Sequence, residues 1–250
     1  MTGMNANDVD AAEIQIPTPD GSIPGYYASP KDGKHCPVVL VVQEIFGVNA
    51  HMKDVCRRFA RLGYLGIAPE LYARQGDVSR MSEIQEIISK VVSRVPDAQV
   101  MSDLDATVEW AVKSGRGDAE RLGIAGFCWG GRVVWLYAAH SNRLKAGAAF
   151  YGQIIGAVSE YRTRTALDYA KELKAPVIGF YGGKDQSIPM DHVHQMQQAL
   201  GEAGKDATIV TYPDAGHAFF ADYRPSYREA EAKDAWERLL EWFRNHGVKP

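Results

Sequence analysis

Hydrophobic and polar positions along the chain form two kinds of segment. Short, mostly β-branched apolar runs such as residues 37–42 are typical of strands buried on both faces of a sheet. Longer stretches such as residues 99–113 place apolar side chains on one face of a helix. Because the two kinds alternate, the pattern predicts an α/β fold with a mainly parallel central sheet flanked by helices. The other expected strands are residues 64–68, 122–126, 146–151, 177–181 and 208–212, and the other expected helices are residues 49–62 and 226–247.

The beginning of the chain has a different pattern. Residues 13–17 and 23–28 are separated by the turn sequence Pro19-Asp20-Gly21, which predicts a short hairpin. Residues 1–12 are polar and acidic and lack a secretion signal, so we expect them to be flexible. Since no linker, repeat or low-complexity tract follows, residues 13–250 are expected to form one enzyme-sized α/β domain. Residues 73–95 have the least regular pattern and are a candidate cover over a site.

Composition and charge narrow the possible partners. A net charge of −3 and a pI near 6.2, with no basic cluster larger than pairs such as Arg57-Arg58, argue against nucleic acid and against an anionic membrane. No apolar run reaches the length of a membrane span. Cys36, Cys56 and Cys128 are widely spaced and include no C-x-x-C pair, which is typical of reduced thiols. We therefore expect a cytoplasmic protein whose partner is a small molecule.

The most distinctive local sequence surrounds Cys128. Residues 126–130 read Gly-Phe-Cys-Trp-Gly, between an apolar strand and a helical stretch that continues to residue 140. This is the pattern of a nucleophile elbow, a sharp strand-to-helix turn that presents one side chain, with cysteine in place of the usual serine. At a helix N-terminus the dipole favours a negatively charged sulfur. The alternative is a buried structural cysteine between two packing glycines.

Two further residues on strand-end loops complete a candidate catalytic triad. Asp185 follows the strand at 177–181 in the sequence Gly-Gly-Lys-Asp, and His217 follows the strand at 208–212. The order Cys128, Asp185, His217 is the nucleophile, acid, histidine order of α/β-hydrolases. Imidazole can accept the thiol proton near neutral pH, and the carboxylate orients the ring. Asp214 is a competing acid, but it lies on the loop of His217 itself and is interpreted as a turn residue.

No metal or organic cofactor is expected, because the histidines lack metal-ligand spacing. His192 and His194 fall in a helical segment and are expected at the surface.

Several motifs together resemble one family. Residues 42–49 read V-Q-E-I-F-G-V-N and residues 68–75 read A-P-E-L-Y-A-R-Q. With the elbow at 126–131, G-G-K-D at 182–185 and A-G-H at 215–217, they closely resemble dienelactone hydrolases, also called carboxymethylenebutenolidases. The resemblance covers residues 13–245. It implies the α/β-hydrolase fold and an activity that opens an unsaturated lactone.

The resemblance also implies roles for residues beside the triad. Glu44 would contact Cys128 and help to control the protonation of its sulfur; alternatively, Glu44 only orders its own loop through backbone amides. The backbone N–H groups of Trp129 and Ile45 would form the oxyanion hole. The Trp129 donor is expected from the elbow itself, whereas Ile45 comes from the family match and from the usual second donor after an early strand.

The substrate-binding residues depart from the family. Dienelactone hydrolases hold the substrate carboxylate with two arginines, and one of these positions is Ala221 in this chain. The other corresponds to Arg80 or Arg94. Arg224 is a candidate replacement, because a guanidinium binds a carboxylate through two hydrogen bonds, although it is equally an exposed residue at a helix start. The candidate aromatic walls, for which core packing is an equal alternative, are Tyr151, Tyr72 and Phe46.

These residues predict a hydrolase that cleaves a lactone or small carboxylic ester. Cys128 would attack the carbonyl and form an acyl-enzyme, with His217 as base and Asp185 orienting it. One alternative is a general carboxylesterase or thioesterase that uses the same triad. The other is a non-enzymatic protein that binds a ligand or senses oxidation through the Cys128 thiol. Whether the protein is a monomer or a dimer stays open.

Overall fold

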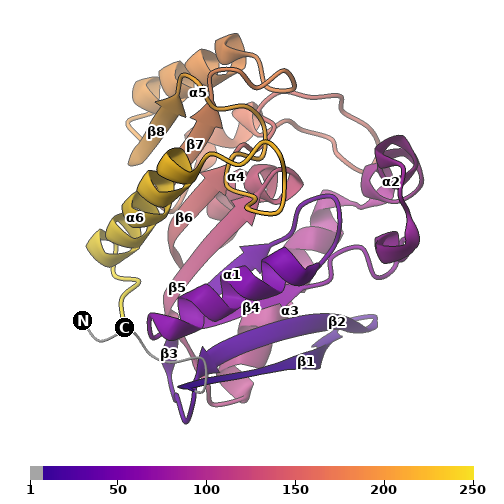
Figure 1. Ribbon diagram of the computed structural model, residues 1–250, viewed down its shortest axis with the longest axis vertical. Coiled ribbons are helices and arrows are strands. Elements are labelled where there is room, and N and C mark those ends of the chain that lie inside the picture. The colour runs from indigo at the N-terminus through magenta and orange to yellow at the C-terminus, as the bar shows by residue number, and fades with distance from the viewer. Residues whose placement is uncertain (1–7) are drawn as a thin grey trace. The chain divides into compact units, whose positions relative to one another are not determined.

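The computed structural model describes residues 8–250 in two compact units. The first unit contains residues up to Gly123 together with Val248–Pro250, and the second contains Ile124–Gly247. The boundary falls inside strand β5 (Gly117–Phe127) (Figure 1). Strands alternate with helices along the chain, which confirms the predicted α/β class. The expectation of a single domain over residues 13–250 stays a prediction.

In the first unit the strands follow the order β1-β2-β4-β3. The strands are β1 (Val9–Thr18), β2 (Gly21–Pro30), β3 (Cys36–Val42) and β4 (Leu65–Pro69). Strands β1 and β2 pair antiparallel, as does β2 with β4, whereas β3 and β4 are parallel. All residues of β3 and β4 are buried, as the continuous apolar runs predicted.

The predicted N-terminal hairpin is confirmed, but it is longer than expected. Strand β1 begins at Val9, which pairs with Pro30, so residues 9–12 belong to the hairpin instead of a flexible terminus. The extra pairing is supported by Asp10, whose carboxylate accepts a hydrogen bond from the Tyr27 hydroxyl (3.0 Å) and pairs with Arg116 (2.8 Å). Residues 1–7 lie outside the described part of the chain.

Helices α1 (Ala50–Arg61) and α3 (Asp97–Lys113) cover opposite faces of these strands. Neighbouring side chains on a strand point to opposite faces. On β2, the Tyr26 hydroxyl accepts a hydrogen bond from Arg57 of α1 (3.0 Å), whereas the Tyr27 ring lies 5.6 Å from the Trp110 ring of α3. Helix α1 begins where predicted, because the Asn49 side chain accepts a hydrogen bond from the backbone N–H of Met52 (3.0 Å).

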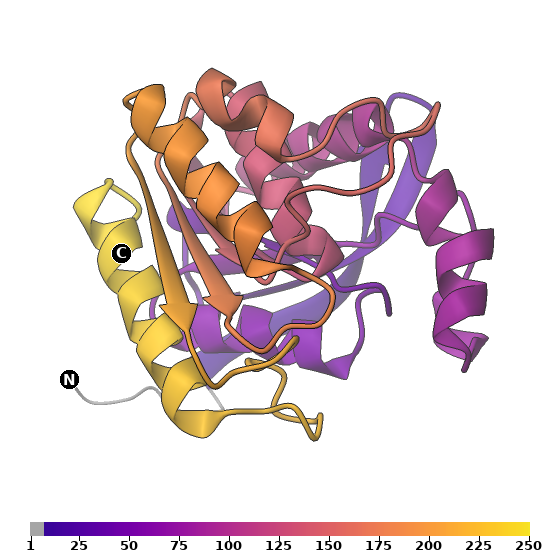
Figure 2. The same cartoon turned by 90° about the horizontal axis from the view of Figure 1, so that it is seen from above.

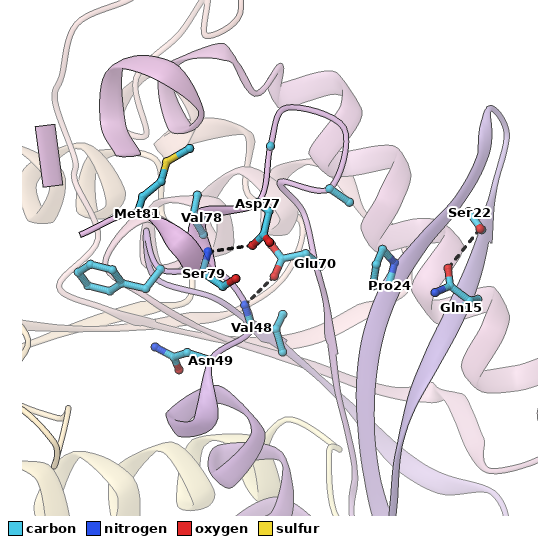
Figure 3. A pocket seen from close by; sticks show the side chains of 13 residues that line it. Gln15, Ser22, Pro24, Val48, Asn49, Glu70, Asp77, Val78, Ser79 and Met81 are labelled. Atoms are coloured by element: carbon cyan, nitrogen blue, oxygen red, sulfur yellow. Dashed lines mark hydrogen bonds between the residues drawn. The ribbon is translucent and has the colours of Figure 1, made fainter. Parts of the chain in front are cut away.

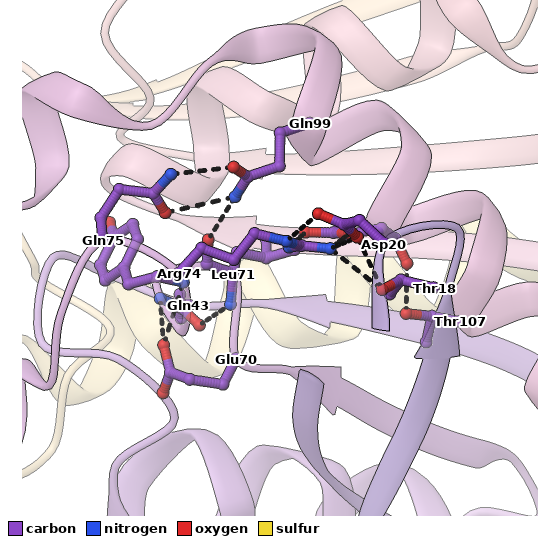
Figure 4. A network of polar contacts seen from close by, with 11 residues as sticks. Thr18, Asp20, Gln43, Glu70, Leu71, Arg74, Gln75, Gln99 and Thr107 are labelled. Carbon is purple, nitrogen blue, oxygen red and sulfur yellow. Dashed lines mark hydrogen bonds and ion pairs between the residues drawn. The ribbon is translucent and has the colours of Figure 1, made fainter. Parts of the chain in front are cut away.

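The segment at 73–95 is anchored at its start by polar contacts (Figure 4). The Arg74 guanidinium donates to both oxygens of Asp103 (2.7 and 3.0 Å) and to both oxygens of Asp20 (2.7 and 2.6 Å). The amides of Gln75 and Gln99 also bond each other (2.8 and 3.2 Å). Arg74 and Gln75, the last two residues of the motif at 68–75, thus connect this segment to the hairpin turn and to α3. Short helices follow, at Val78–Arg80 (η2), Ile84–Lys90 (α2) and Val92–Arg94 (η3).

In the second unit the strands follow the order β5-β6-β7-β8. Strands β6 (Leu144–Phe150), β7 (Val177–Gly182) and β8 (Ala207–Tyr212) are parallel neighbours. Figure 2 shows α5 and α6 on either side of β7 and β8. All the strands predicted here are present within one or two residues of their expected starts, apart from β5, which begins earlier. The helices of this unit are α4 (Trp129–His140), η4 (Leu167–Glu172), α5 (Met190–Glu202) and α6 (Glu229–Asn245).

Aromatic side chains fill the core of the second unit below the strand ends. The Phe150 ring on β6 lies 4.8 Å from Phe127 on β5 and 4.7 Å from Phe180 on β7. Phe220, in the segment after β8, lies 5.2 Å from Phe127. Such ring pairs stabilise packing beyond the area they bury, so the ends of neighbouring strands are held at fixed positions.

No helix within residues 8–250 combines the length and the apolar character needed to span a bilayer.

Replacing Arg74 with alanine should lower the free energy of unfolding by about 3 kcal/mol, because it leaves the Asp103 carboxylate, 1% exposed, without its charged partner. Urea denaturation measures the change. Lys90→Ala is the matched control, since Lys90 and Glu86 form an exposed pair on α2 and its loss should cost less than about 1 kcal/mol. Equal costs for the two variants would contradict the structural role of Arg74.

Candidate active site

Cys128 lies in a strained turn between β5 and α4. Its backbone has φ 53° and ψ −111°, a conformation that L-residues rarely adopt. The N–H of Cys128 donates to the carbonyl of Phe150 at the end of β6 (3.0 Å), and its side chain is half-buried. The sharp strand-to-helix turn that the sequence predicted is therefore present, with the thiol at its apex.

Glycines permit this turn because backbones touch around it. A Cβ atom on Gly126 would lie 2.1 Å from the carbonyl oxygen of Gly130, and one on Gly131 would lie 2.4 Å from that of Phe150. A Cβ on Gly152 would lie 2.3 Å from the carbonyl carbon of Gly131. Any larger residue would push the first turn of α4 away from β6.

The three predicted triad residues meet in the second unit. The Nε2 atom of His217 lies 3.1 Å from the Cys128 sulfur, and its Nδ1 atom lies 2.7 Å from Oδ2 of Asp185. Each residue follows a different strand of the unit, at the end where ligands of parallel sheets usually bind. A thiol, an imidazole and a carboxylate in this chain can pass a proton from sulfur to nitrogen and hold the resulting charges.

The loops that carry Asp185 and His217 also pack backbone to backbone. A Cβ on Gly182 would lie 2.5 Å from the carbonyl oxygen of Ala215, and the N–H of Lys184 donates to that carbonyl (2.9 Å). The interpretation of Asp214 as a turn residue agrees with its position, because its carboxylate is 79% exposed and pairs with Lys184 (2.6 Å).

The His217 ring is held in its protonated form. Burial opposes the positive charge, but the hydrogen bonds to Asp185 and then to Cys128 outweigh it and raise the pKa of His217 to about 10. Burial also opposes ionisation of Asp185, whose side chain is 1% exposed. The contacts with His217 and Ser187 outweigh this and lower the pKa of Asp185. The carboxylate is therefore charged at neutral pH.

Ser187 is a site residue that the sequence reasoning missed. Its N–H (2.8 Å) and its hydroxyl (2.6 Å) both donate to Oδ1 of Asp185, and the hydroxyl oxygen lies 3.2 Å from Nδ1 of His217. Asp185 thus uses one oxygen for His217 and the other for Ser187. The sequence signal was the spacing Asp-x-Ser, since aspartate commonly accepts the N–H two residues later.

Tyr151, one of the predicted substrate-wall residues, lies beside the imidazole of His217. Its side chain is fully buried, with φ 38°, and its ring lies 5.1 Å from the His217 ring and 5.4 Å from Phe219. Tyr151 thus packs in the core against the edge of the imidazole, and its role as a substrate wall stays a prediction. Trp129, the proposed oxyanion donor, is buried at the first position of α4, directly after Cys128.

The first unit carries the other predicted site residues on the loop after β3. Glu44 is 1% exposed, and Ile45 and Phe46 are half-buried. Tyr72, predicted as a second wall, is fully buried, and its hydroxyl donates to the carbonyl of Glu44 (3.4 Å). Tyr72 therefore supports this loop from the core, whereas Phe46 lines a cavity (Figure 3).

A polar network holds the loop after β3. The Gln43 amide, fully buried, donates to Glu70 (3.0 Å) and accepts from the N–H of Leu71 (3.2 Å). The other Glu70 oxygen accepts from the N–H of Val48 (2.8 Å). Gln43 and Glu70, one residue from each of the two motifs, thus connect the loops after β3 and β4.

The candidate arginines do not assemble around this cavity. The Arg80 side chain is 89% exposed, 3.7 Å from Asp77, and Arg94 is exposed; neither lines the cavity. Ala221 is fully buried, and Arg224 is half-buried in the turns after β8. A carboxylate-binding role for Arg224 stays a prediction. Within residues 8–250, no group of three or more His, Cys, Asp or Glu side chains is placed to hold a metal ion.

Comparisons with known proteins show the family of this chain. The dienelactone hydrolase family model matches residues 23–247. A Methylorubrum extorquens protein named by inference as a carboxymethylenebutenolidase is 58% identical over 244 residues, covering 98% of this chain and 84% of that protein. The crystal structure of a Klebsiella pneumoniae protein assigned as a dienelactone hydrolase has a TM-score of 0.92 and 53% identity, covering 96% of this chain and 99% of that one.

A more distant relative is also similar over most of its length. A Bradyrhizobium protein assigned as a 2-oxo-3-(5-oxofuran-2-ylidene)propanoate lactonase is 30% identical over 241 residues, which cover 93% of both chains.

Asp185→Asn should lower the pKa of His217 from its value of about 10, because the hydrogen bond to the Asp185 carboxylate is the largest contribution that favours the protonated ring. In this variant, burial of the His217 ring lowers its pKa with less opposition from hydrogen bonds. NMR titration of the His217 ring protons measures the shift, and Asp214→Asn is the matched control on a neighbouring loop. An unchanged His217 pKa in Asp185→Asn would contradict this electrostatic account.

Ser187→Ala should move the acidic limb of the pH–rate profile to higher pH. The hydrogen bond from the Ser187 hydroxyl lowers the pKa of Asp185, so its loss raises that pKa, and the carboxylate becomes protonated at a higher pH than in the wild type. A decrease of about threefold to tenfold in kcat at neutral pH should accompany the shift. Ser187→Thr keeps the hydroxyl and should restore the profile; a wild-type profile in Ser187→Ala would refute the role.

Proposed function

Because this chain belongs to the dienelactone hydrolase family, whose members hydrolyse carboxylic esters, we propose that it cleaves a lactone or small carboxylic ester through Cys128, His217 and Asp185. The observation that supports the proposal is the continuous contact from sulfur to imidazole (3.1 Å) to carboxylate (2.7 Å). Each contact is within the range needed for proton transfer and for orientation of the base.

The first half of the proposed reaction forms an acyl-enzyme. The proton of the Cys128 thiol is held by His217, whose raised pKa favours the protonated ring, and the sulfur attacks the carbonyl carbon of the substrate. The negative charge moves to the carbonyl oxygen, which the N–H groups of Trp129 and Ile45 are proposed to hold. The C–O bond of the ester then breaks, and the leaving oxygen takes the proton from His217. In a lactone this oxygen stays attached to the acyl group.

The second half restores the enzyme. Water gives a proton to His217 and attacks the thioester carbonyl, and a second tetrahedral intermediate collapses to release the acid. The sulfur leaves with its negative charge beside the His217 ring, which keeps the proton taken from water. Asp185 stays ionised through both halves, because Ser187 and His217 occupy its two oxygens and stabilise the negative charge.

Glu44 is proposed to influence the protonation of Cys128. The proposal is supported by the burial of Glu44, 1% exposed, which keeps the residue away from bulk water. The contact of Tyr72 with the Glu44 backbone supports the alternative, in which the residue helps to order its loop. Both roles are compatible, since one uses the side chain and the other the backbone.

A general carboxylesterase or thioesterase is the second candidate. It is favoured by the buried Ala221 and the exposed Arg80, at positions where a carboxylate-binding arginine was expected. A non-enzymatic thiol sensor is less well supported, because it needs no base oriented by an acid. All three cysteines are free thiols, which supports our proposal of a cytoplasmic location for the protein.

Cys128→Ala should abolish hydrolysis across a panel of esters and lactones, because it removes the nucleophile, while Cys128→Ser should keep weak activity, since a hydroxyl ionises less readily. Turnover of an activated ester measures both. Cys36→Ala is the matched control, because it also replaces a free cysteine, but one that lies in the first unit and outside the proposed triad. Mass spectrometry of the wild type mixed with a slow substrate should show one acyl group on Cys128. Full activity in Cys128→Ala would disprove the scheme.

A further inference from the structure

Tyr151, the residue that follows β6, has a backbone conformation that its side chain disfavours. Its φ of 38° lies in the left-handed region, which glycine adopts freely and bulky L-residues rarely adopt. The surrounding backbone holds it there. Its N–H donates to the carbonyl of Phe180 on β7 (2.8 Å), and a Cβ on Gly152, the next residue, would lie 2.3 Å from the carbonyl carbon of Gly131. A tyrosine at this position therefore costs backbone strain, and such strain is concentrated at functional sites.

The Tyr151 side chain, which is fully buried, contacts both the imidazole and the aromatic core. Its ring centroid lies 5.1 Å from that of His217, with an angle of 62° between the planes, and 5.4 Å from that of Phe219, at 74°. The Phe219 ring lies 5.1 Å from that of Tyr212 at the end of β8, whose hydroxyl donates to Asp234 on α6 (2.7 Å). The imidazole thus packs on a series of rings that is anchored to a helix of the same unit.

The hydrogen bonds of His217 restrain the position of its ring more than the tilt of its ring. Asp185 contacts Nδ1 (2.7 Å), and the Cys128 sulfur contacts Nε2 (3.1 Å). Hydrogen bonds of ring nitrogens lie close to the ring plane, so they oppose tilting of the ring only weakly. A second ring packed at an angle opposes it directly, because tilting would bring atoms of the two rings into collision. A displacement of about 1 Å can decrease the rate of an enzyme about 100-fold, so this restraint matters for catalysis.

We propose that Tyr151 is a positioning residue, whose ring prevents the His217 imidazole from tilting and keeps Nε2 directed at the Cys128 sulfur. The strained backbone brings the ring into contact with the imidazole, which explains a tyrosine at a position where glycine would be unstrained. Tyr151 acts through His217 and needs no contact with the substrate. The expected effect on hydrolysis rests on the proposed function, whereas the effect on the contact between Nε2 and sulfur does not.

Turnover of an activated ester by three variants tests the proposal. Tyr151→Leu removes the ring and should lower kcat about tenfold or more with little change in KM, because the base is misplaced while the substrate still binds. Tyr151→Phe keeps the ring and should stay within about twofold of the wild type. Phe180→Leu is the matched control, since it truncates another fully buried ring of this core, one that packs on Phe150 (4.7 Å), and it should leave kcat nearly unchanged. Equal kcat in the wild type and Tyr151→Leu would overturn the proposal, as would equal losses in Tyr151→Leu and Phe180→Leu.

Alkylation of Cys128 by iodoacetamide tests the geometry without any ester. The thiolate is the reacting form of a cysteine, and a neighbouring imidazolium favours it. Cys128 should therefore react about threefold or more slowly at pH 7 in Tyr151→Leu than in the wild type, and at a rate closer to that of His217→Gln. Mass spectrometry of the peptide that contains Cys128 measures the rates. Tyr151→Phe should react at the wild-type rate, and the same rate in Tyr151→Leu would refute the positioning role.

The two measurements separate failure of this proposal from failure of the proposed function. If the wild type hydrolyses no ester, the proposed function fails, and the alkylation rates then decide the role of Tyr151. If circular dichroism shows that Tyr151→Leu does not fold, Phe219→Leu takes its place, because it removes a ring on which Tyr151 packs. Cys128 should then react more slowly in Phe219→Leu than in the wild type, and an unchanged rate would overturn the proposal.

Discussion

Direct contact between the backbones of α4 and β6 is the constraint on which the site depends. Cys128 stays in a strained conformation because Gly131 and Gly152 let the first turn of α4 reach the end of β6, and because the Cys128 N–H donates to Phe150. The same principle applies one loop further on, where Gly182 lets the loop of Asp185 approach the backbone beside His217. The absence of side chains at these glycines thus allows the positions of Cys128 and Asp185.

The charges of the site follow from this packing. Burial alone would discharge both Asp185 and His217, but their mutual contact reverses the effect and keeps the pair ionised. Ser187 occupies the second oxygen of Asp185, and Tyr151 packs on the imidazole ring. The imidazole is therefore held on its Nδ1 side and along one edge, while Nε2 faces the sulfur.

In the first unit, polar side chains of two sequence motifs have structural roles, because they hold loops together. Arg74 and Gln43 each bridge segments that are distant in sequence, and both are satisfied by several hydrogen bonds. They hold the loop after β3 and the start of the segment at 73–95. Glu70, which accepts a hydrogen bond from Gln43, also lines the cavity beside this loop.

The sequence by itself determined most of the strands and helices, the α/β class and the order of Cys128, Asp185 and His217 on strand-end loops. These features depend on hydrophobic periodicity and turn chemistry, which are local properties of the chain. Only the tertiary structure decided that Ser187 bonds Asp185, that Tyr151 and Tyr72 pack in the core, and that residues 9–12 join the hairpin. These outcomes depend on burial and on contacts between residues that are distant in the sequence. A local pattern of residues along the chain specifies neither.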